Sequence, residues 1–241
     1  MSDHVEAVLF DLDGTLAATM EPWDRCWADY AADHGHTWTD ADRRGTHGHG
    51  DWARYLARVC GIGAVDQVVT DCVEAMVALV EAGRIELLPG VDMLLATATS
   101  RVATGVVSAS PRRFVAATLD HFGLRRSLQV VVAREDQMRT KPHPQPWLHA
   151  AALLAVEPNT CVAVEDSVAG VRSAHAAGMR VLAIPSWAPT SSPSEAELAE
   201  HLAPDADHAQ RWLHSVLTEP ARTIARRASA TSSSARTCRR C

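Results

Sequence analysis

The chain has 241 residues, of which 47% are hydrophobic and 22% are charged. These ordinary values exclude a mainly disordered chain, a collagen-like repeat and a small disulfide scaffold, and the length fits one large domain or one domain with an insertion. The net charge is −6, but the last 21 residues contain six Arg and no acid, so the first 220 residues carry −12. We therefore expect no nucleic-acid partner.

We expect neither a membrane span nor an export signal in this sequence. No apolar run approaches the roughly 18 residues that a membrane span needs, and the N-terminus lacks a basic segment followed by a long apolar stretch. Cys238 and Cys241 form a C-x-x-C pair in a Ser- and Arg-rich tail, a spacing too weak to indicate a metal or redox site. We expect a cytoplasmic monomer with no membrane partner.

Short apolar runs alternate with helical patterns over much of the chain. The run at 5–10 (VEAVLF) ends in Asp-Leu-Asp-Gly, which predicts a buried strand followed by a turn. Four further strands are predicted, at 104–107, 129–132, 161–164 and 180–184, with helices starting near Pro111, Pro144 and Val168. This alternation indicates right-handed crossovers and a parallel sheet covered on both faces. We expect an α/β fold, a Rossmann-like doubly wound core over residues 1–16 and 89–217.

The alternation stops between residues 17 and 88, where apolar residues recur at helical spacing. This predicts an inserted all-helical cap. Four of the seven Trp lie in it and could line a substrate pocket, although a small helical bundle must also fill its own core. Towards the C-terminus the sequence predicts a helix from Glu195 and a disordered basic tail over residues 218–241.

Polar side chains follow four of the predicted strands. Asp11 and Asp13 come after the first strand, where the period of two makes them point the same way. The other candidates after strands are Ser108, Lys141, Glu165 and Asp166. Because open α/β sheets bind ligands outside the carboxyl ends of their strands, we expect these side chains to converge on one crevice.

The chemistry of this set indicates a metal ion and a phosphate ester. Clustered carboxylates repel unless a cation joins them, and an all-oxygen set suits Mg²⁺, which binds substrate phosphate. Of the 23 basic residues, 22 are Arg and only Lys141 is Lys, a compact point charge rather than a planar fork. We therefore expect Mg²⁺ as cofactor and a small phosphorylated metabolite as partner.

Four motifs in order carry a family resemblance. They are DLDGTL at 11–16, VVSAS at 106–110, TKPHPQPW at 140–147 and VEDSVAGVRSAHAAGM at 164–179. Together they resemble the haloacid dehalogenase superfamily of phosphotransferases, from residue 5 to about residue 185. The resemblance implies a Rossmann-like core with a mobile helical cap that closes over the substrate.

The resemblance also implies roles for single residues. Asp11 is the nucleophile that forms an aspartyl-phosphate, and Asp13 protonates the leaving oxygen and then activates water. Ser108 donates to a phosphoryl oxygen, and Lys141 neutralises charge on the transferred group.

The implied Mg²⁺ ligands are Asp11, the main-chain carbonyl of Asp13 and Asp166. Glu165 lies close by or acts through water. A carboxylate paired with Mg²⁺ and Lys stays ionised and can attack phosphorus.

A cap loop at 45–51 (GTHGHGD) looks like the His-Gly loop of sugar- and glycerol-phosphate phosphatases of this family. An Arg commonly follows His-Gly there, whereas His49 holds that place here, which leaves Arg43, Arg44 or Arg112 as possible substitutes. The candidate substrate-binding residues are Ala109, Arg112, Arg44, His47 and His49. The cap histidines could instead hold a metal, but no further ligand set accompanies them.

These observations predict a Mg²⁺-dependent phosphatase that acts on small sugar or polyol phosphates through an aspartyl-phosphate. One alternative is a β-phosphoglucomutase-like isomerase, which shares the motifs. Mutases of this type resemble one another in placing a cap lysine on the substrate, whereas this cap has no Lys. Another is a non-catalytic phosphosugar-binding protein, which would have no use for both a nucleophile and an acid–base group.

Overall fold

The computed structural model describes residues 4–46, 51–186 and 193–218. At its centre lies a parallel six-stranded sheet in the order β3-β2-β1-β4-β5-β6. The strands are β1 Ala7–Phe10, β2 Ala103–Val107, β3 Val130–Val132, β4 Cys161–Glu165, β5 Arg180–Ala183 and β6 His201–Leu202. The predicted doubly wound α/β core is confirmed.

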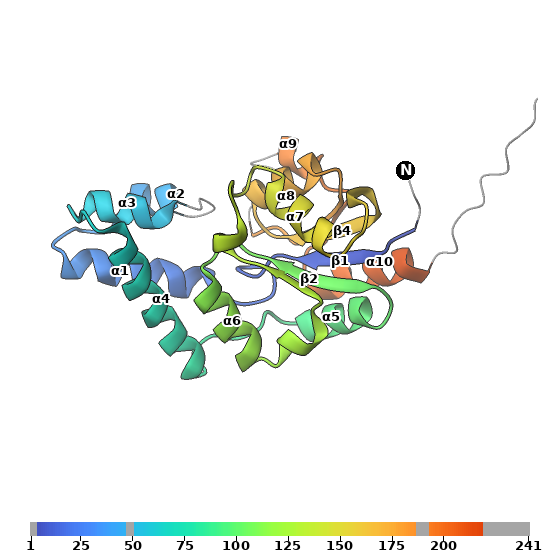
Figure 1. Ribbon diagram of the computed structural model, residues 1–241, viewed down its shortest axis with the longest axis horizontal. Coiled ribbons are helices and arrows are strands. Elements are labelled where there is room, and N and C mark those ends of the chain that lie inside the picture. Colours follow the sequence, from blue (N-terminus) through green and yellow to red (C-terminus); the bar gives the residue numbers. More distant parts are fainter. Residues whose placement is uncertain (1–3, 47–50, 187–192, 219–241) are drawn as a thin grey trace, which may run out of the picture.

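Helices cover both faces of the sheet (Figure 1). On one face lie α5 Val91–Thr99, α6 Arg112–His121 and α10 Ala206–Thr218, and on the other α7 Gln145–Leu153, α8 Val168–Ala176 and the single turn α9 Pro193–Ala196. Alternate side chains of β1 pack against the helices on opposite faces of the sheet. Val8 and Phe10 join the apolar cluster of the first face, and Ala7 and Leu9 join that of the second.

The predicted insertion is helical and stands to one side of the sheet (Figure 1). It contains α1 Met20–Asp33, α2 Asp40–Thr46, α3 Trp52–Val59 and α4 Val65–Glu81. The two connections to the sheet run beside each other. Ala18 N donates to Glu86 O at 2.9 Å, and Leu88 N donates to Leu16 O at 2.9 Å. This pairing lies where the helical segment leaves and rejoins the sheet, and we call residues 17–88 the cap.

The C-terminal part differs from prediction. The helix expected from Glu195 is only the turn α9, and it is followed by the two-residue strand β6 and by α10, neither of which we predicted. Helix α5 was also not predicted. Residues 47–50, which include His47 and His49, and the predicted tail from residue 219 lie outside the described residues.

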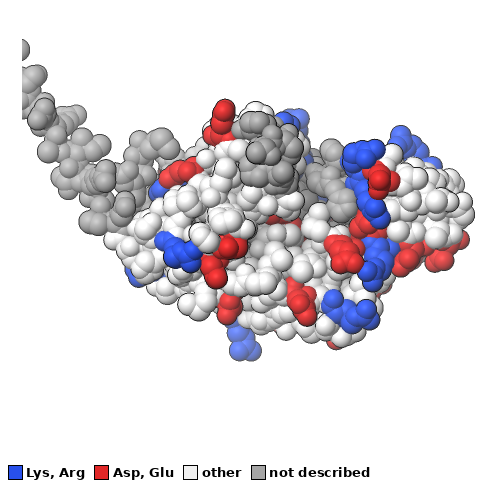
Figure 2. Space-filling model, turned by 180° about the vertical axis from the view of Figure 1, so that it is seen from behind, with Lys and Arg blue, Asp and Glu red and all other residues white. Residues whose placement is uncertain are grey.

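Charge is mixed over the surface. On the face opposite to that of Figure 1, acidic and basic side chains are interspersed, with several of each gathered on the side of the cap (Figure 2). Among the described helices, none is long and apolar enough to cross a membrane.

Candidate active site

The carboxyl ends of β1 and β4 bring four ionisable side chains together. Asp11 follows β1, Glu165 ends β4 and Asp166 comes next, while Lys141 enters from the loop that precedes α7. All four are buried, with exposures of 6%, 0%, 2% and 7% respectively. Burial of three carboxylates beside one ammonium is costly unless each charge is paired or hydrogen-bonded.

Lys141 is held by three acceptors. Its Nζ donates to Asp11 Oδ1 at 2.6 Å, to Glu165 Oε1 at 2.6 Å and to the carbonyl of Val107 at 2.9 Å. The ammonium also lies 4.6 Å from the centre of the Trp147 ring. Burial alone would lower the pKa of Lys141, but the adjacent carboxylates of Asp11 and Glu165 raise it above its ordinary value. The group is therefore a fixed positive charge.

Glu165 accepts hydrogen bonds from the residues that follow it in the chain. Its Oε2 accepts from Asp166 N at 3.1 Å and from Ser167 N and Oγ at 3.0 Å each. Ser167 is also the N-cap of α8 and accepts from Gly170 N. A Cβ on Gly170 would lie only 1.8 Å from Glu165 Cδ, so the close packing of α8 on this carboxylate requires glycine.

Asp11, Glu165 and Asp166 can each offer one oxygen such that the three atoms lie within 4.8 Å of one another. Burial raises the pKa of Asp11 well above its ordinary value; Lys141 opposes this rise, and the neighbouring carboxylates add to it. Burial, together with Glu165, raises the pKa of Asp166 to about 7. Three carboxyl groups therefore share one ammonium, and without a further cation their crowding favours protonation of Asp11 and Asp166.

The turn after Asp13 allows this crowding. Gly14 has φ +83°, in the left-handed region that favours glycine, and a Cβ there would lie 2.5 Å from Asp166 Oδ2. Thr15 Oγ1 donates to the other oxygen, Asp166 Oδ1, at 3.2 Å. The DLDGT turn thus sets both the direction of Asp13 and the room for Asp166.

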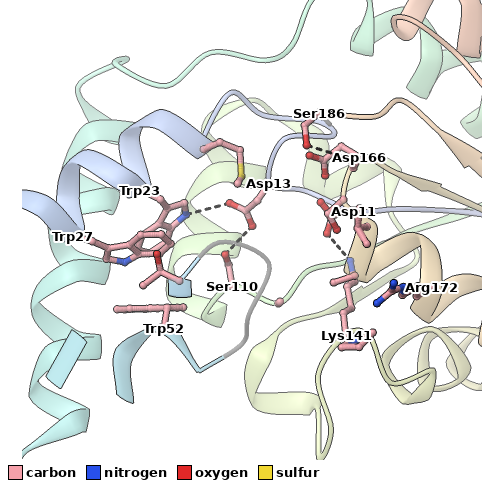
Figure 3. Close-up of a pocket in the computed structure, with 17 residues that line it drawn as sticks. Asp11, Asp13, Trp23, Trp27, Trp52, Ser110, Lys141, Asp166, Arg172 and Ser186 are labelled. Carbon is pink, nitrogen blue, oxygen red and sulfur yellow. Dashed lines mark hydrogen bonds and ion pairs between the residues drawn. The ribbon is translucent and has the colours of Figure 1, made fainter. Parts of the chain in front are cut away.

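The Asp13 carboxylate points away from Lys141 and towards the cap (Figure 3). Its Oδ1 accepts from Thr19 Oγ1 at 2.7 Å and from Trp23 Nε1 at 3.2 Å. Its Oδ2 accepts from Ser108 Oγ at 3.0 Å and from Ser110 Oγ at 2.7 Å. Two donors therefore come from the start of α1 and two from the loop after β2.

These groups open into a pocket of about 450 Å³ between the sheet edge and the cap. Asp11, Asp13, Lys141 and Asp166 lie at one end, and Trp23, Trp27 and Trp52 form the wall on the cap side (Figure 3). The three indoles pack on one another with ring centres 5.5–5.6 Å apart. The tryptophans of the cap thus fill its core and line the pocket at the same time.

The structure brings together five of the predicted core residues, Asp11, Asp13, Lys141, Glu165 and Asp166. Ser108 lies behind them, fully buried; its Oγ donates to Asp13 and accepts from Ser110 N.

The predicted substrate-binding residues are more scattered. Ala109 lines the pocket, whereas Arg112 pairs with Asp136 and Arg44 is exposed, and neither arginine is among the lining residues. The substrate roles of these residues and of His47 and His49 stay predictions.

Sequence reasoning missed several lining residues, among them Met20, Ser110, Arg172 and Ser186, and left open whether the cap tryptophans line the pocket. Ser110 belongs to the VVSAS motif, two positions after Ser108, so strand-end spacing could have indicated it. The other positions depend on how α1, α8 and the segment after β5 pack together, which their local sequence does not encode.

Comparison with known proteins identifies the family. A family model for haloacid dehalogenase-like hydrolases matches residues 5–178. The chain belongs to this family. The resemblance drawn from the four motifs is therefore confirmed, and the residues that carry it are those that meet at the sheet edge.

Three relatives illustrate the similarity. Hexitol phosphatase B of Escherichia coli (strain K12) is 36% identical over 191 residues, which cover 76% of this chain and 84% of that protein. Protein CbbY of Rhodobacter capsulatus is 32% identical over 198 residues, covering 76% and 86%. The crystal structure of a CbbY mutant from Rhodobacter sphaeroides, in complex with xylulose-(1,5)bisphosphate, has a TM-score of 0.72 and 29% identity, covering 84% of this chain and 95% of that one.

The contact between α8 and Glu165 predicts an unusual effect of Gly170→Ala. Alanine normally stabilises a helix interior by about 1 kcal/mol relative to glycine, but here the added methyl must displace a buried carboxylate from its hydrogen bonds. We expect the free energy of unfolding to fall on the order of 3 kcal/mol, measured by urea denaturation. The control Gly63→Ala, where a Cβ meets nothing within 4 Å, should change it by less than about 1 kcal/mol. A stable Gly170→Ala protein would contradict the packing.

The raised pKa of Asp166 predicts how the metal-free protein responds to pH. Because the folded pKa of about 7 exceeds the unfolded one, the native state holds a proton that the unfolded chain releases, and stability is lost as pH rises from about 4 to 7. Asp166→Asn removes this contribution. In EDTA, we expect wild type to lose several kcal/mol relative to Asp166→Asn across this range, at about 1.4 kcal/mol per pKa unit. Parallel curves of unfolding free energy against pH would show that Asp166 does not titrate as described.

Proposed function

We propose that this protein is a phosphatase that hydrolyses phosphate monoesters of small sugars or polyols through an aspartyl-phosphate on Asp11. The observation that carries the proposal is the arrangement at one end of the pocket. There Asp11 is paired with the fixed charge of Lys141, and Asp13 faces the same space from the next turn (Figure 3).

The chain's own residues supply two linked half-reactions. Asp11 Oδ attacks phosphorus while the bond from phosphorus to the ester oxygen breaks, and a protonated Asp13 gives its proton to that oxygen. Asp13, now a carboxylate, takes a proton from water, whose oxygen attacks phosphorus and breaks the bond to Asp11. Lys141 offsets charge on the transferred group in both steps.

A divalent cation fits the donors present. Asp11, Asp166 and Glu165 form a cluster of buried carboxyl oxygens with one ammonium among them, and oxygen ligands of this kind are those that Mg²⁺ prefers. Because both oxygens of Glu165 are engaged by Lys141, Ser167 and the main chain, Asp11 and Asp166 are the side chains that would hold it. When bound, Mg²⁺ would screen the phosphate from the carboxylates and keep Asp11 ionised.

The pocket wall indicates the kind of leaving group. Opposite the carboxylates it consists of three indoles, which offer broad apolar faces and suit the C–H surface of a sugar or polyol. The relatives' names agree with this class, since one is a hexitol phosphatase and a CbbY crystal contains a ketopentose bisphosphate. The substrate is therefore a small phosphorylated polyhydroxy compound.

A phosphate-release screen tests the proposed function. After dialysis against EDTA, the protein should release phosphate from hexitol, ketose or aldose phosphates when Mg²⁺ is restored, and not without it. Nucleotide and glycolate phosphates should be poorer substrates, and Asp11→Asn should be inactive. Full hydrolysis after chelation would overturn the metal assignment, and lack of release from every ester would overturn the phosphatase proposal.

The same screen separates a phosphatase from a mutase. With β-glucose 1-phosphate, a trace of glucose 1,6-bisphosphate and Mg²⁺, we expect free phosphate and no excess of glucose 6-phosphate. Faster accumulation of glucose 6-phosphate than of phosphate would mean that a sugar rather than water receives the phosphoryl group.

Lys141→Arg should fail to replace the lysine. The three short bonds from one nitrogen converge in a buried site, and a planar guanidinium cannot direct donors to the same three oxygens in the same space. We expect kcat to fall on the order of 10²-fold with a hexitol phosphate as substrate. The control Arg139→Lys, on the exposed part of the same loop, should retain the wild-type kcat. A near-normal rate for Lys141→Arg would exclude the role given to the ammonium.

A further inference from the structure

The two carboxylate oxygens of Asp13 accept hydrogen bonds from different parts of the chain. Oδ2 is held by hydroxyls of the loop after β2, Ser108 and Ser110, whereas Oδ1 is held by Thr19 and by the Trp23 indole. Thr19 is the N-cap residue of α1 and Trp23 lies in its first turn. The acid–base carboxylate is therefore bonded both to the sheet edge and to the first helix of the cap.

Trp23 differs from the other three donors. A hydroxyl can both donate and accept a proton, so Thr19, Ser108 and Ser110 can reorient as Asp13 changes its protonation state. An indole N–H can only donate. It cannot relay the proton, but it can fix where Oδ1 lies, and a bond to an ionised carboxylate is stronger than one between neutral groups.

The Trp23 ring has little freedom to move. It is 3% exposed and packs edge-on against Phe114 of α6 with ring centres 5.0 Å apart. On its other sides it stacks with Trp27 at 5.6 Å and meets Trp52 at 5.5 Å. The ring is thus held by Phe114 of the core helix α6, by Trp52 of the cap helix α3 and by Trp27 of its own helix. Its N–H points at Asp13, and the residue lines the pocket (Figure 3).

We propose that Trp23 is a positioning residue for the acid–base group: its indole N–H aligns Asp13 with the leaving oxygen. Because the ring is held by Phe114, Trp27 and Trp52 together, the alignment is correct only when the cap sits on the core as it does here. The inference rests on the acid–base role proposed for Asp13. It assigns to Trp23 a part in the rate of the reaction as well as in the shape of the pocket.

Leaving-group dependence tests this proposal. An alkyl phosphate, such as a hexitol phosphate, needs a proton on its departing oxygen. From 4-nitrophenyl phosphate the leaving group is 4-nitrophenolate, a stable anion that needs little help from an acid. Trp23→Phe keeps an aromatic ring in the stack and removes the N–H. The quantity to measure is kcat/KM, which reports the first transfer step. We expect it to fall about tenfold or more for the hexitol ester, which is part of the effect of losing a general acid altogether. For the aryl ester we expect a fall of less than about threefold.

Trp52→Phe is the matched control. It makes the same substitution in the same stack and on the same pocket wall, but it leaves the Trp23 N–H in place. Because Trp52 contacts the substrate in the proposed site, the substitution should change KM for the hexitol ester. The ratio of kcat/KM for the hexitol ester to kcat/KM for the aryl ester should stay within about threefold of wild type, because the acid remains aligned. Asp13→Asn gives the reference pattern for loss of the acid.

Each outcome decides the proposal. A selective loss with the alkyl ester in Trp23→Phe, of the kind seen in Asp13→Asn, supports it. Proportional loss with both esters, no loss, or the same selectivity in Trp52→Phe overturns it. If Trp23→Phe does not fold, Phe114→Leu loosens the ring from the core side and should give the same selectivity in weaker form; its absence there counts against the proposal. If Asp13→Asn itself shows no leaving-group selectivity, the proposed acid–base role of Asp13 fails instead.

Discussion

Burial of three carboxylates beside one ammonium is the constraint on which the rest of the structure depends. Asp11, Glu165 and Asp166 sit where parallel strands end, so their main chains are fixed by the sheet and cannot move apart. Repulsion among them is reduced by Lys141 and by main-chain N–H groups, and space for them exists because Gly14 and Gly170 carry no Cβ. A divalent cation would offset the repulsion that remains and allow a phosphate ester to approach the carboxylates.

The site divides into a supporting half and a reacting half. Glu165 has both oxygens bonded, one to Lys141 and the other to the start of α8, so it orients neighbours and is poorly placed to react. Asp11 shares Lys141 with it but also faces the pocket, and Asp13 faces the same space from the cap side. Two acids close in sequence thus differ in role, since one is tied to a fixed cation and the other to neutral donors.

Much of the core could be predicted because its signals are local. Strands such as β1 and β4 are short apolar runs that end in polar turns, and parallel strands must bring Asp11 and Asp166 to one edge. The two residues of β6 are too few to show a period, and α5 mixes alanine, leucine and threonine without a polar face. The sequence could not decide whether the cap tryptophans pack the cap or line the pocket, because both tasks use the same residue type. Trp23 does both.

Under the proposed function, this double use links specificity to rate. A pocket wall is normally free to change when a protein adapts to a new leaving group, because it contacts the substrate away from the reacting atoms. Here the wall residue Trp23 is bonded to Asp13, and Trp27 and Trp52 hold its ring in place. Substitutions of Trp23 would therefore change the pocket wall and the bond to Asp13 together. Trp27 and Trp52 reach Asp13 only through Trp23, so under the proposed function they can change the wall while the Trp23 bond to Asp13 stays in place.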